Sequence, residues 1–330
     1  MSEAEVRAAA LASARKTLDP GRYATLLALA LLLAFNFAVT PHFATWQTLN
    51  VNLTQVCNIV IVGTGMTLVI ATGGIDLSVG SLMAISGALA PLIFLGKILP
   101  IANIYLAVAL AMTAAVLVAG LFGWFNGWLI TRFRIQPIIA TLVLFIAGRG
   151  IAQVATNGNL QPFKVPEFQF IGLGRWFGIP VQVILMLAIV AAAAWMMRKT
   201  LFGRQIIAIG GNERAARLGG IPVGRTKRWV YFISGLCAGV AGLVVIAINS
   251  SSDANLVGLG MELDAIAAVA VGGTSLGGGR ASIIGTLIGA LIIQLVRYTL
   301  LANGVPDAAA LMVKAAIIIA AVALQRQCRG

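Results

Sequence analysis

Long apolar stretches separated by short polar connections make up almost all of this chain. Each stretch is close to the roughly 20 residues that a helix needs to cross the hydrocarbon core of a bilayer. The stretches lie at about 23–39, 52–72, 79–95, 101–130, 135–155, 181–197, 229–248, 263–301 and 308–324. Since 263–301 is long enough to cross twice, the pattern predicts an all-α polytopic membrane protein with about ten transmembrane helices.

Basic residues give the expected orientation of these helices. They gather at 7–22, 132–134, 198–228 and 326–329, all on one side of a ten-helix arrangement. Lysine and arginine are enriched in cytoplasmic loops, so this side, with both ends of the chain, is predicted to be cytoplasmic. The chain then divides into a cytoplasmic tail at 1–21, without the pattern of a secretory signal peptide, a membrane domain at 22–325 and a basic tail at 326–330.

Composition agrees with a membrane protein and excludes several classes of function. The chain is 60% hydrophobic and 10% charged, whereas soluble domains are about 25% charged. The net charge of +13 does not indicate nucleic-acid binding, because the basic residues flank apolar segments and form no aromatic-interleaved platform. With one histidine and three widely separated cysteines, the sequence predicts no metal site, disulfide framework or Ser-His catalytic pair.

A first pair of glycines interrupts the membrane domain after the second apolar stretch. Gly73 and Gly74 stand in the segment TGGIDLSVG and are predicted to break the helix. Asp76 or Ser78 can cap a new helix that begins near Leu77. A broken helix at membrane depth is tolerated where it is buried or lines a cavity, so Asp76 has two possible roles: capping, or gating and conduction.

A second pair, Gly272 and Gly273, predicts another break. Placing this pair over Gly73 and Gly74 aligns Leu276 with Leu77 and Gly279 with Gly80. The alignment indicates an internal repeat, although coincidence in a short glycine-rich match is the alternative.

Amide side chains in the second stretch are candidates for a polar path. Asn52, Gln55 and Asn58 lie in its outer half, where such groups should face protein or water rather than lipid. They indicate either a translocation path or hydrogen bonds between helices. The candidate path residues are these three together with Asp76, Ser78 and Asn249.

The longest polar interruption runs from 198 to 228 and carries eight basic residues against the single acid Glu213. Within it Asn212 can cap a helix N-terminus, and Gly219 with Gly220 can end that helix. The pattern predicts a helix of about two turns, which is too short to be stable without packing against something else.

Two motifs carry a resemblance to a known family. The pattern Asn-Glu-x-Ala-Ala-x-Leu-x-Gly-Ile at 212–221 and the segment TGGIDLSVG at 72–80 resemble the ABC-transporter permeases that import sugars of the ribose and galactofuranose type. The resemblance extends from the second apolar stretch to the last. In that family a short cytoplasmic helix docks in a groove of the ATP-binding subunit. The resemblance implies this coupling role for Gly211, Asn212, Glu213, Ala215, Ala216, Gly219, Gly220 and Ile221.

The same resemblance implies a bacterial inner-membrane permease for a monosaccharide and a set of partners. These are an ATP-binding subunit that holds ATP-Mg, a second permease chain, identical or paralogous, and a sugar-binding protein outside the membrane. The outer segment 156–180, with Phe163, Phe168, Phe170, Trp176 and Phe177, is a candidate contact for that protein, or its rings lie in the headgroup belt. The chain has no P-loop sequence, so we expect neither a cofactor nor ATP hydrolysis in this chain.

The alternative is a stand-alone secondary transporter coupled to protons or sodium. Carboxylates within membrane segments mark ion sites in such proteins. Asp76, Glu262 or Asp264 would then carry the coupling ion.

Overall fold

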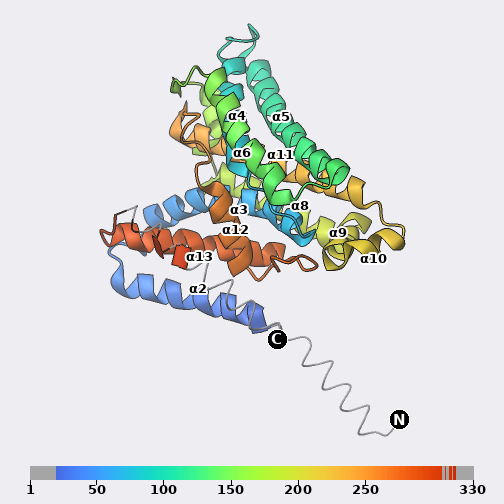
Figure 1. Cartoon of the computed structure of the whole chain (residues 1–330). Coiled ribbons are helices and arrows are strands. Elements are labelled where there is room, and N and C mark those ends of the chain that lie inside the picture. The colour runs from blue at the N-terminus through green and yellow to red at the C-terminus, as the bar shows by residue number, and fades with distance from the viewer. Residues whose placement is uncertain (1–19, 307–308, 310–311, 314, 317–330) are drawn as a thin grey trace.

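The computed structural model describes residues 20–306, 309, 312–313 and 315–316. Within this part the chain is built from twelve helices, with four strands of two residues each (Figure 1). The helices are α2 (Pro20–Val39), α3 (Trp46–Ala71), α4 (Val79–Phe94), α5 (Ile104–Phe133), α6 (Pro137–Ala155), α7 (Pro166–Leu173), α8 (Val181–Lys199), α9 (Leu201–Gly211), α10 (Glu213–Leu218), α11 (Val223–Asn249), α12 (Met261–Val271) and α13 (Ile283–Ala302). The predicted all-α class is confirmed.

Six of the described helices are long and apolar enough to cross a membrane, namely α3, α5, α6, α8, α11 and α13. The segment 25–39 of α2 and helix α4 are shorter apolar helices. The stretch 263–301, expected to hold two spans, contains α13 and the 11-residue α12. At 1.5 Å per residue α12 covers only about 16 Å. The expected last span at 308–324 and both predicted tails fall mostly outside the described residues. The chain is a polytopic membrane protein.

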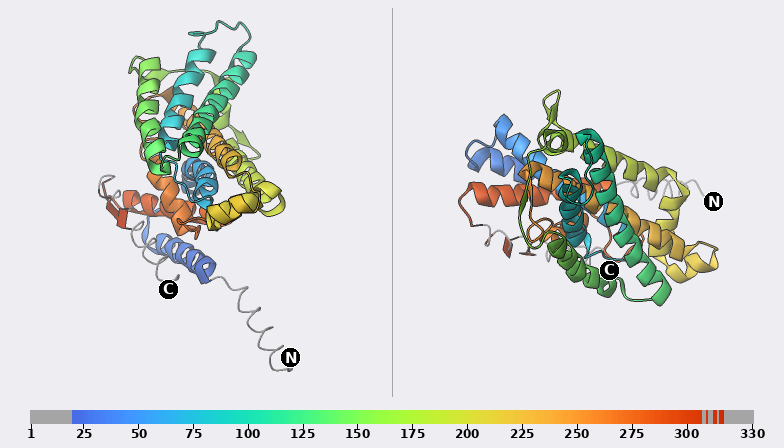
Figure 2. Two further views of the ribbon diagram at one scale, coloured as in Figure 1. Left: turned by 45° about the vertical axis from the view of Figure 1, so that its right-hand side comes forward. Right: turned by 90° about the horizontal axis from the view of Figure 1, so that it is seen from above.

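Helix α3 lies at the centre of the molecule. Every residue from Val56 to Ala71 is buried, as expected for a helix that is apolar on all sides. It packs against α8, α11, α12 and α13. In Figures 1 and 2, α4, α5, α6 and α11 lie on one side of α3, and α2, α12 and α13 lie on the other.

Glycines bring α5 and α11 into close contact. The sequence contains Gly120, Gly123 and Gly127 at helical spacing on α5, and all three face α11. A methyl group on Gly123 would overlap the carbonyl oxygen of Tyr231. Small residues allow such close approach between helices in a bilayer.

The outer segment 156–180 has more structure than the predicted loop. Pro166 starts α7 at its first position, where a missing N–H costs nothing. Phe168 is fully buried and packs on Phe94 and Phe163 with ring centroids 5.0 and 5.5 Å apart. Phe163 and Phe168 therefore lie in the protein core and not in a headgroup belt.

The strands are all in the outer connections. β1 (Gln161–Pro162) pairs with β4 (Ser251–Ser252) and ties the two connections together. β2 (Arg175–Trp176) and β3 (Ile179–Pro180) form a short hairpin. At its tip the rings of Trp176 and Phe177 stack with centroids 6.2 Å apart, and both are exposed.

We predict that Gly123→Ala lowers the thermal stability of the purified chain in detergent. The added methyl group must push α5 away from the backbone of α11, at a cost of about 1–3 kcal/mol. The measurement is the unfolding midpoint followed by loss of monodisperse protein on heating. Gly150→Ala on α6 is the matched control, because a methyl group there meets no atom within 4 Å. Equal midpoints for the two variants would contradict the packing argument.

Candidate functional site

Helix α10 has a defined beginning and end although it is only six residues long. The side chain of Asn212 accepts a hydrogen bond from the backbone N–H of Ala215 at 3.0 Å. At the other end the N–H of Ile221 bonds to the carbonyl of Ala216, and that of Gly220 to Arg217. This is a Schellman ending, and it needs the left-handed conformation that Gly220 adopts at φ +81°. The predicted cap and stop therefore lie where the sequence indicated.

One face of α10 packs on its own chain. Ala216 is buried with Ile209 of α9 and Val223 of α11, and Ile221 packs against them. The opposite face is open. Leu218 is 90% exposed, and Arg214, Ala215 and Gly219 are exposed beside it. Leu218 stands in the motif at 212–221, but it was not among the expected coupling residues.

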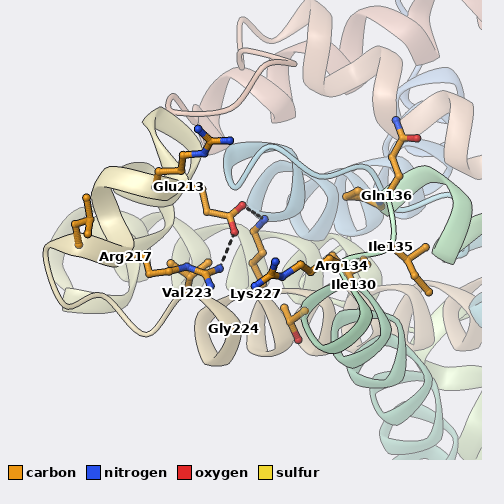
Figure 3. Close-up of a pocket in the computed structure, with 13 residues that line it drawn as sticks. Ile130, Arg134, Ile135, Gln136, Glu213, Arg217, Val223, Gly224 and Lys227 are labelled. Atoms are coloured by element: carbon orange, nitrogen blue, oxygen red, sulfur yellow. Dashed lines mark hydrogen bonds and ion pairs between the residues drawn. The ribbon is translucent and has the colours of Figure 1, made fainter.

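Glu213 connects α10 to α11 (Figure 3). Its carboxylate oxygens lie 2.7 Å from Lys227 Nζ and 3.2 Å from an Arg217 guanidinium nitrogen. Partial burial pushes the pKa of Glu213 upward, but hydrogen bonds and charges from Lys227 and Arg217 outweigh burial and hold the pKa below its ordinary value. The Lys227 side chain is only 12% exposed, so this ion pair is less screened than a surface pair.

A pocket of about 750 Å³ lies between α10, the start of α11 and the turn that joins α5 to α6 (Figure 3). Arg134, Ile135 and Gln136 line it from the turn. The charged residues in its lining are Arg134, Arg214, Arg217, Lys227 and one acid, Glu213. The excess of positive charge suits an acidic protein surface better than a cationic or neutral one.

Glycines also join α9 to the first helix break and to the chain after α12. The backbone N–H of Gly279 donates to the carbonyl of Ala71, at the end of α3, at 3.1 Å. A methyl group on Gly210 of α9 would overlap both of those atoms, and one on Gly278 would lie 2.9 Å from the Gly73 nitrogen and the Gly210 oxygen. We call Gly73, Gly210, Gly278 and Gly279 the glycine junction. It places the segment that leads into α10 directly against the first break and against the chain that follows the second break.

The two breaks have the same local geometry, with a different alignment from the one expected. Gly73 and Gly273 both have φ +81°. The N–H of Gly74 bonds to Val69, and that of Thr274 bonds to Val269. Gly273 therefore corresponds to Gly73 rather than to Gly74, and the expected alignment was wrong by one residue. The backbone conformation decides the alignment, because the sequence alone allows either glycine of one pair to be matched to either glycine of the other.

Asp76 and Ser78 together connect the first break to α11 and α5. One oxygen accepts from the backbone N–H of Ser78 at 3.0 Å and from its hydroxyl at 2.6 Å. The other accepts from Ser234 of α11 at 2.9 Å. Asn126 of α5 donates to the Ser78 hydroxyl at 2.9 Å. Helix α4 begins at Val79, and the Ser78 side chain makes no capping hydrogen bond. Of the two residues expected to cap this helix, only Asp76 accepts a hydrogen bond from a backbone N–H there.

The remaining candidate path residues do not form one group. Asn52 and Gln55 lie near the start of α3, where Gln294 of α13 donates to Gln55 at 2.6 Å and to Asn52 at 3.5 Å. Asn58 is buried further along α3, and Asn249 is exposed at the end of α11. Asp76 and Ser78 lie beyond the other end of α3. Gln294 was not predicted, although it is the one amide in the otherwise largely apolar α13.

Comparison with known proteins identifies the family. A family model described as "Branched-chain amino acid transport system / permease component" matches residues 49–322. This chain belongs to that permease family. The resemblance to ABC-transporter permeases indicated by the two motifs is confirmed. The protein is thus the membrane-embedded permease component of a transport system, and not an enzyme or a stand-alone transporter.

Curated relatives match this permease over most of its length. The galactofuranose transporter permease of Escherichia coli K12 is 39% identical over 92% of this chain and 89% of its own. The ribose import permease of the same strain is 41% identical over 90% of this chain and 91% of its own. The L-arabinose ABC transporter permease of Azospirillum brasilense is 33% identical over 86% of this chain and 80% of its own. No solved structure matched the permease.

We predict that Lys227→Met destabilises the permease in a pH-dependent way. The lowered pKa of Glu213 means that its ion pairs stabilise the fold fully above the ordinary glutamate value of 4.5 and lose this effect as the pH falls through the folded-state pKa. The unfolding midpoint of Lys227→Met should lie below that of the wild type at pH 7, by the equivalent of about 1 kcal/mol, and the difference should shrink below pH 4.5.

Lys199→Met is the matched control, since Lys199 is exposed and makes no ion pair within the described part of the chain. A difference that persists unchanged in acid would assign the effect to lost packing of the lysine stem.

Proposed function

We propose that this permease forms the translocation path of an ATP-driven importer for a monosaccharide such as ribose or galactofuranose. The proposal rests on the sugar-transport relatives that match nine tenths of the chain. The proposal includes about ten membrane-spanning helices, two helix breaks and cytoplasmic ends of the chain. The protein would reside in a bacterial inner membrane, with a second permease chain completing the path.

The observation that carries the coupling part of the proposal is the exposed face of α10. A leucine that is 90% exposed on a short, firmly packed helix, beside a basic pocket, is a docking surface for another protein. The partner we propose is the ATP-binding subunit, which would bind ATP-Mg and hydrolyse it. The residues at 211–221 would be its contact, with Leu218 entering a groove and the pocket facing acidic side chains.

The glycine junction would transmit a movement of α10 to the translocation path. α9 leads directly into α10, and Gly210 of α9 touches the carbonyl of Ala71 and the N–H of Gly279. When the two ATP-binding subunits close on ATP, they would move α10 and with it α9. Because backbone atoms are in contact at the junction, α9 cannot shift without displacing the end of α3 or the segment after α12.

An extracytoplasmic sugar-binding protein is the third proposed partner. The β2–β3 hairpin offers it the exposed Trp176 and Phe177 at the tip of a short rigid loop. Rigid exposed aromatic residues are typical anchors of protein interfaces.

Affinity purification from the native membrane in mild detergent tests the coupling surface. We expect the wild-type permease to retain an ATP-binding subunit, identified by mass and by ATP hydrolysis in the eluate. The variants Leu218→Asp and Glu213→Arg should retain little of the ATP-binding subunit. Leu218→Asp places a charge in the groove of that subunit, and Glu213→Arg reverses the charge that holds α10 on α11. Leu173→Asp, an exposed leucine of the outer helix α7, is the control. A permease that copurifies with no ATPase and transports under an ion gradient alone would overturn the proposal.

Gly210→Ala should separate ATP hydrolysis from transport. The added methyl group forces α9 away from Ala71 and Gly279, so movement of α10 no longer reaches the breaks. In proteoliposomes containing the complete importer, we expect ATPase binding and basal hydrolysis to persist while sugar uptake falls at least about tenfold, equivalent to about 1.4 kcal/mol of coupling. Gly224→Ala is the control, because its methyl group would meet only Thr131 Cβ at 3.7 Å. Normal uptake by Gly210→Ala would rule out transmission through the junction.

A further inference from the structure

A second cavity lies far from α10, where α2, α3 and α13 meet. Its volume is about 340 Å³, within the range of about 300 to 1,000 Å³ for small-molecule sites. It is next to the connection between α2 and α3, and in Figure 1 this connection and α10 lie at opposite ends of the molecule. If α10 faces the cytoplasm, this cavity opens toward the outer side of the membrane.

The lining combines aromatic rings with a few uncharged polar groups. Phe37, Phe43 and Trp46 supply rings, and leucines cover most of the remaining wall. Phe37 and Phe43 pack edge to face at 5.0 Å. The polar side chains of the lining are those of Thr45, Thr48, Asn52 and Gln294, and no charged residue lines the cavity.

Gln294 is at the centre of a hydrogen-bonded cluster that includes Asn52 from the lining and Gln55 from outside it. The Gln294 side chain is only 2% exposed, although it comes from an apolar helix. Its amide nitrogen donates to the side-chain oxygens of Gln55 and Asn52. Among the described residues its carbonyl oxygen receives no hydrogen bond. In the cavity this oxygen is an available acceptor for the O–H of a hydroxyl group.

A neutral polyhydroxylated ligand fits this lining better than the other possible occupants. Amides and a hydroxyl would bond its hydroxyl groups, and the aromatic rings would cover its C–H face. An ion has no counter-charge here. A lipid chain would leave the carbonyl oxygen of Gln294 without a hydrogen-bonding partner in hydrocarbon.

We propose that this cavity is a monosaccharide-binding station in the outer half of the translocation path, with Gln294 positioning Asn52 toward the sugar. The proposal rests on the sugar-import function proposed above. It adds the location of a sugar site and a residue, Gln294, that forms it. The sugar would reach the cavity after release outside the membrane and before the breaks near the cytoplasmic end open.

Thiol accessibility tests whether the cavity holds water or lipid. In a permease with its three cysteines replaced by alanine, Leu49→Cys places a thiol in the lining, and Val143→Cys places one on the exposed face of α6. In proteoliposomes with the complete importer, a charged methanethiosulfonate added outside should modify Leu49→Cys and not Val143→Cys. Saturating transported sugar should slow the modification. Equal resistance of both thiols would indicate a lipid-filled groove and would overturn the proposal.

Transport kinetics test the role of Gln294. Uptake of labelled D-ribose, D-galactose, D-fructose and L-arabinose by the wild-type importer first identifies the best substrate, and uptake of none of them would count against the proposed function itself. For that substrate, Gln294→Leu should raise KM about tenfold, equivalent to about 1.4 kcal/mol, without loss of assembly or ATP hydrolysis. Gln294→Asn should restore part of the affinity.

Gln182→Leu is the matched control for a merely structural effect. Gln182 is also 2% exposed and bonds to α3, at Thr54, 3.1 Å away, but it does not line the cavity. If Gln182→Leu and Gln294→Leu change KM equally, or if Gln294→Leu lowers only the amount of folded protein, the cluster is an interhelical contact and the proposal fails.

Discussion

The need to satisfy backbone hydrogen bonds away from water governs this fold. A helix that stops inside a membrane protein leaves N–H and C=O groups that lipid cannot bond. At the first break the free carbonyl of Ala71 receives the N–H of Gly279, and Asp76 accepts the N–H of Ser78. Another segment thus completes the first break. α9, α11 and the chain after α12 pack around this break, so it cannot move independently of them.

This dependence explains why so many glycines lie where α9 meets the end of α3 and the chain after α12. A hydrogen bond between two backbones needs both to approach without side chains between them, and at the junction three segments do so at once. Packed interiors respond to displacement by switching between discrete arrangements rather than by gradual deformation. A junction of backbone contacts is therefore suited to pass a small movement of α9 to the breaks.

Local signals in the sequence predicted local features well, and contacts between distant segments poorly. Asn212, Gly219 and Gly220 act within a few residues of themselves, so the ends of α10 could be predicted from residue types. The same holds for the glycines of α5, whose helical spacing shows that they share one face. The one-residue error in aligning the breaks arose because paired glycines are chemically identical, and only φ distinguishes them. Gln294 and Leu218 were missed because their importance depends on what faces them, although a lone amide in an apolar helix was a usable signal.

Helix α3 connects the two ends of the permease. Its first turns carry Asn52, which lines the second cavity, and its last carbonyl, at Ala71, belongs to the contacts of the glycine junction. From Asn52 to Ala71 the helix covers about 28 Å at 1.5 Å per residue, and the part after Val56 is buried on all sides. In the proposed importer, a displacement of the end of α3 at the junction would shift Asn52 and Gln55 relative to Gln294 on α13, so loss of these hydrogen bonds and movement of the breaks would be parts of one motion.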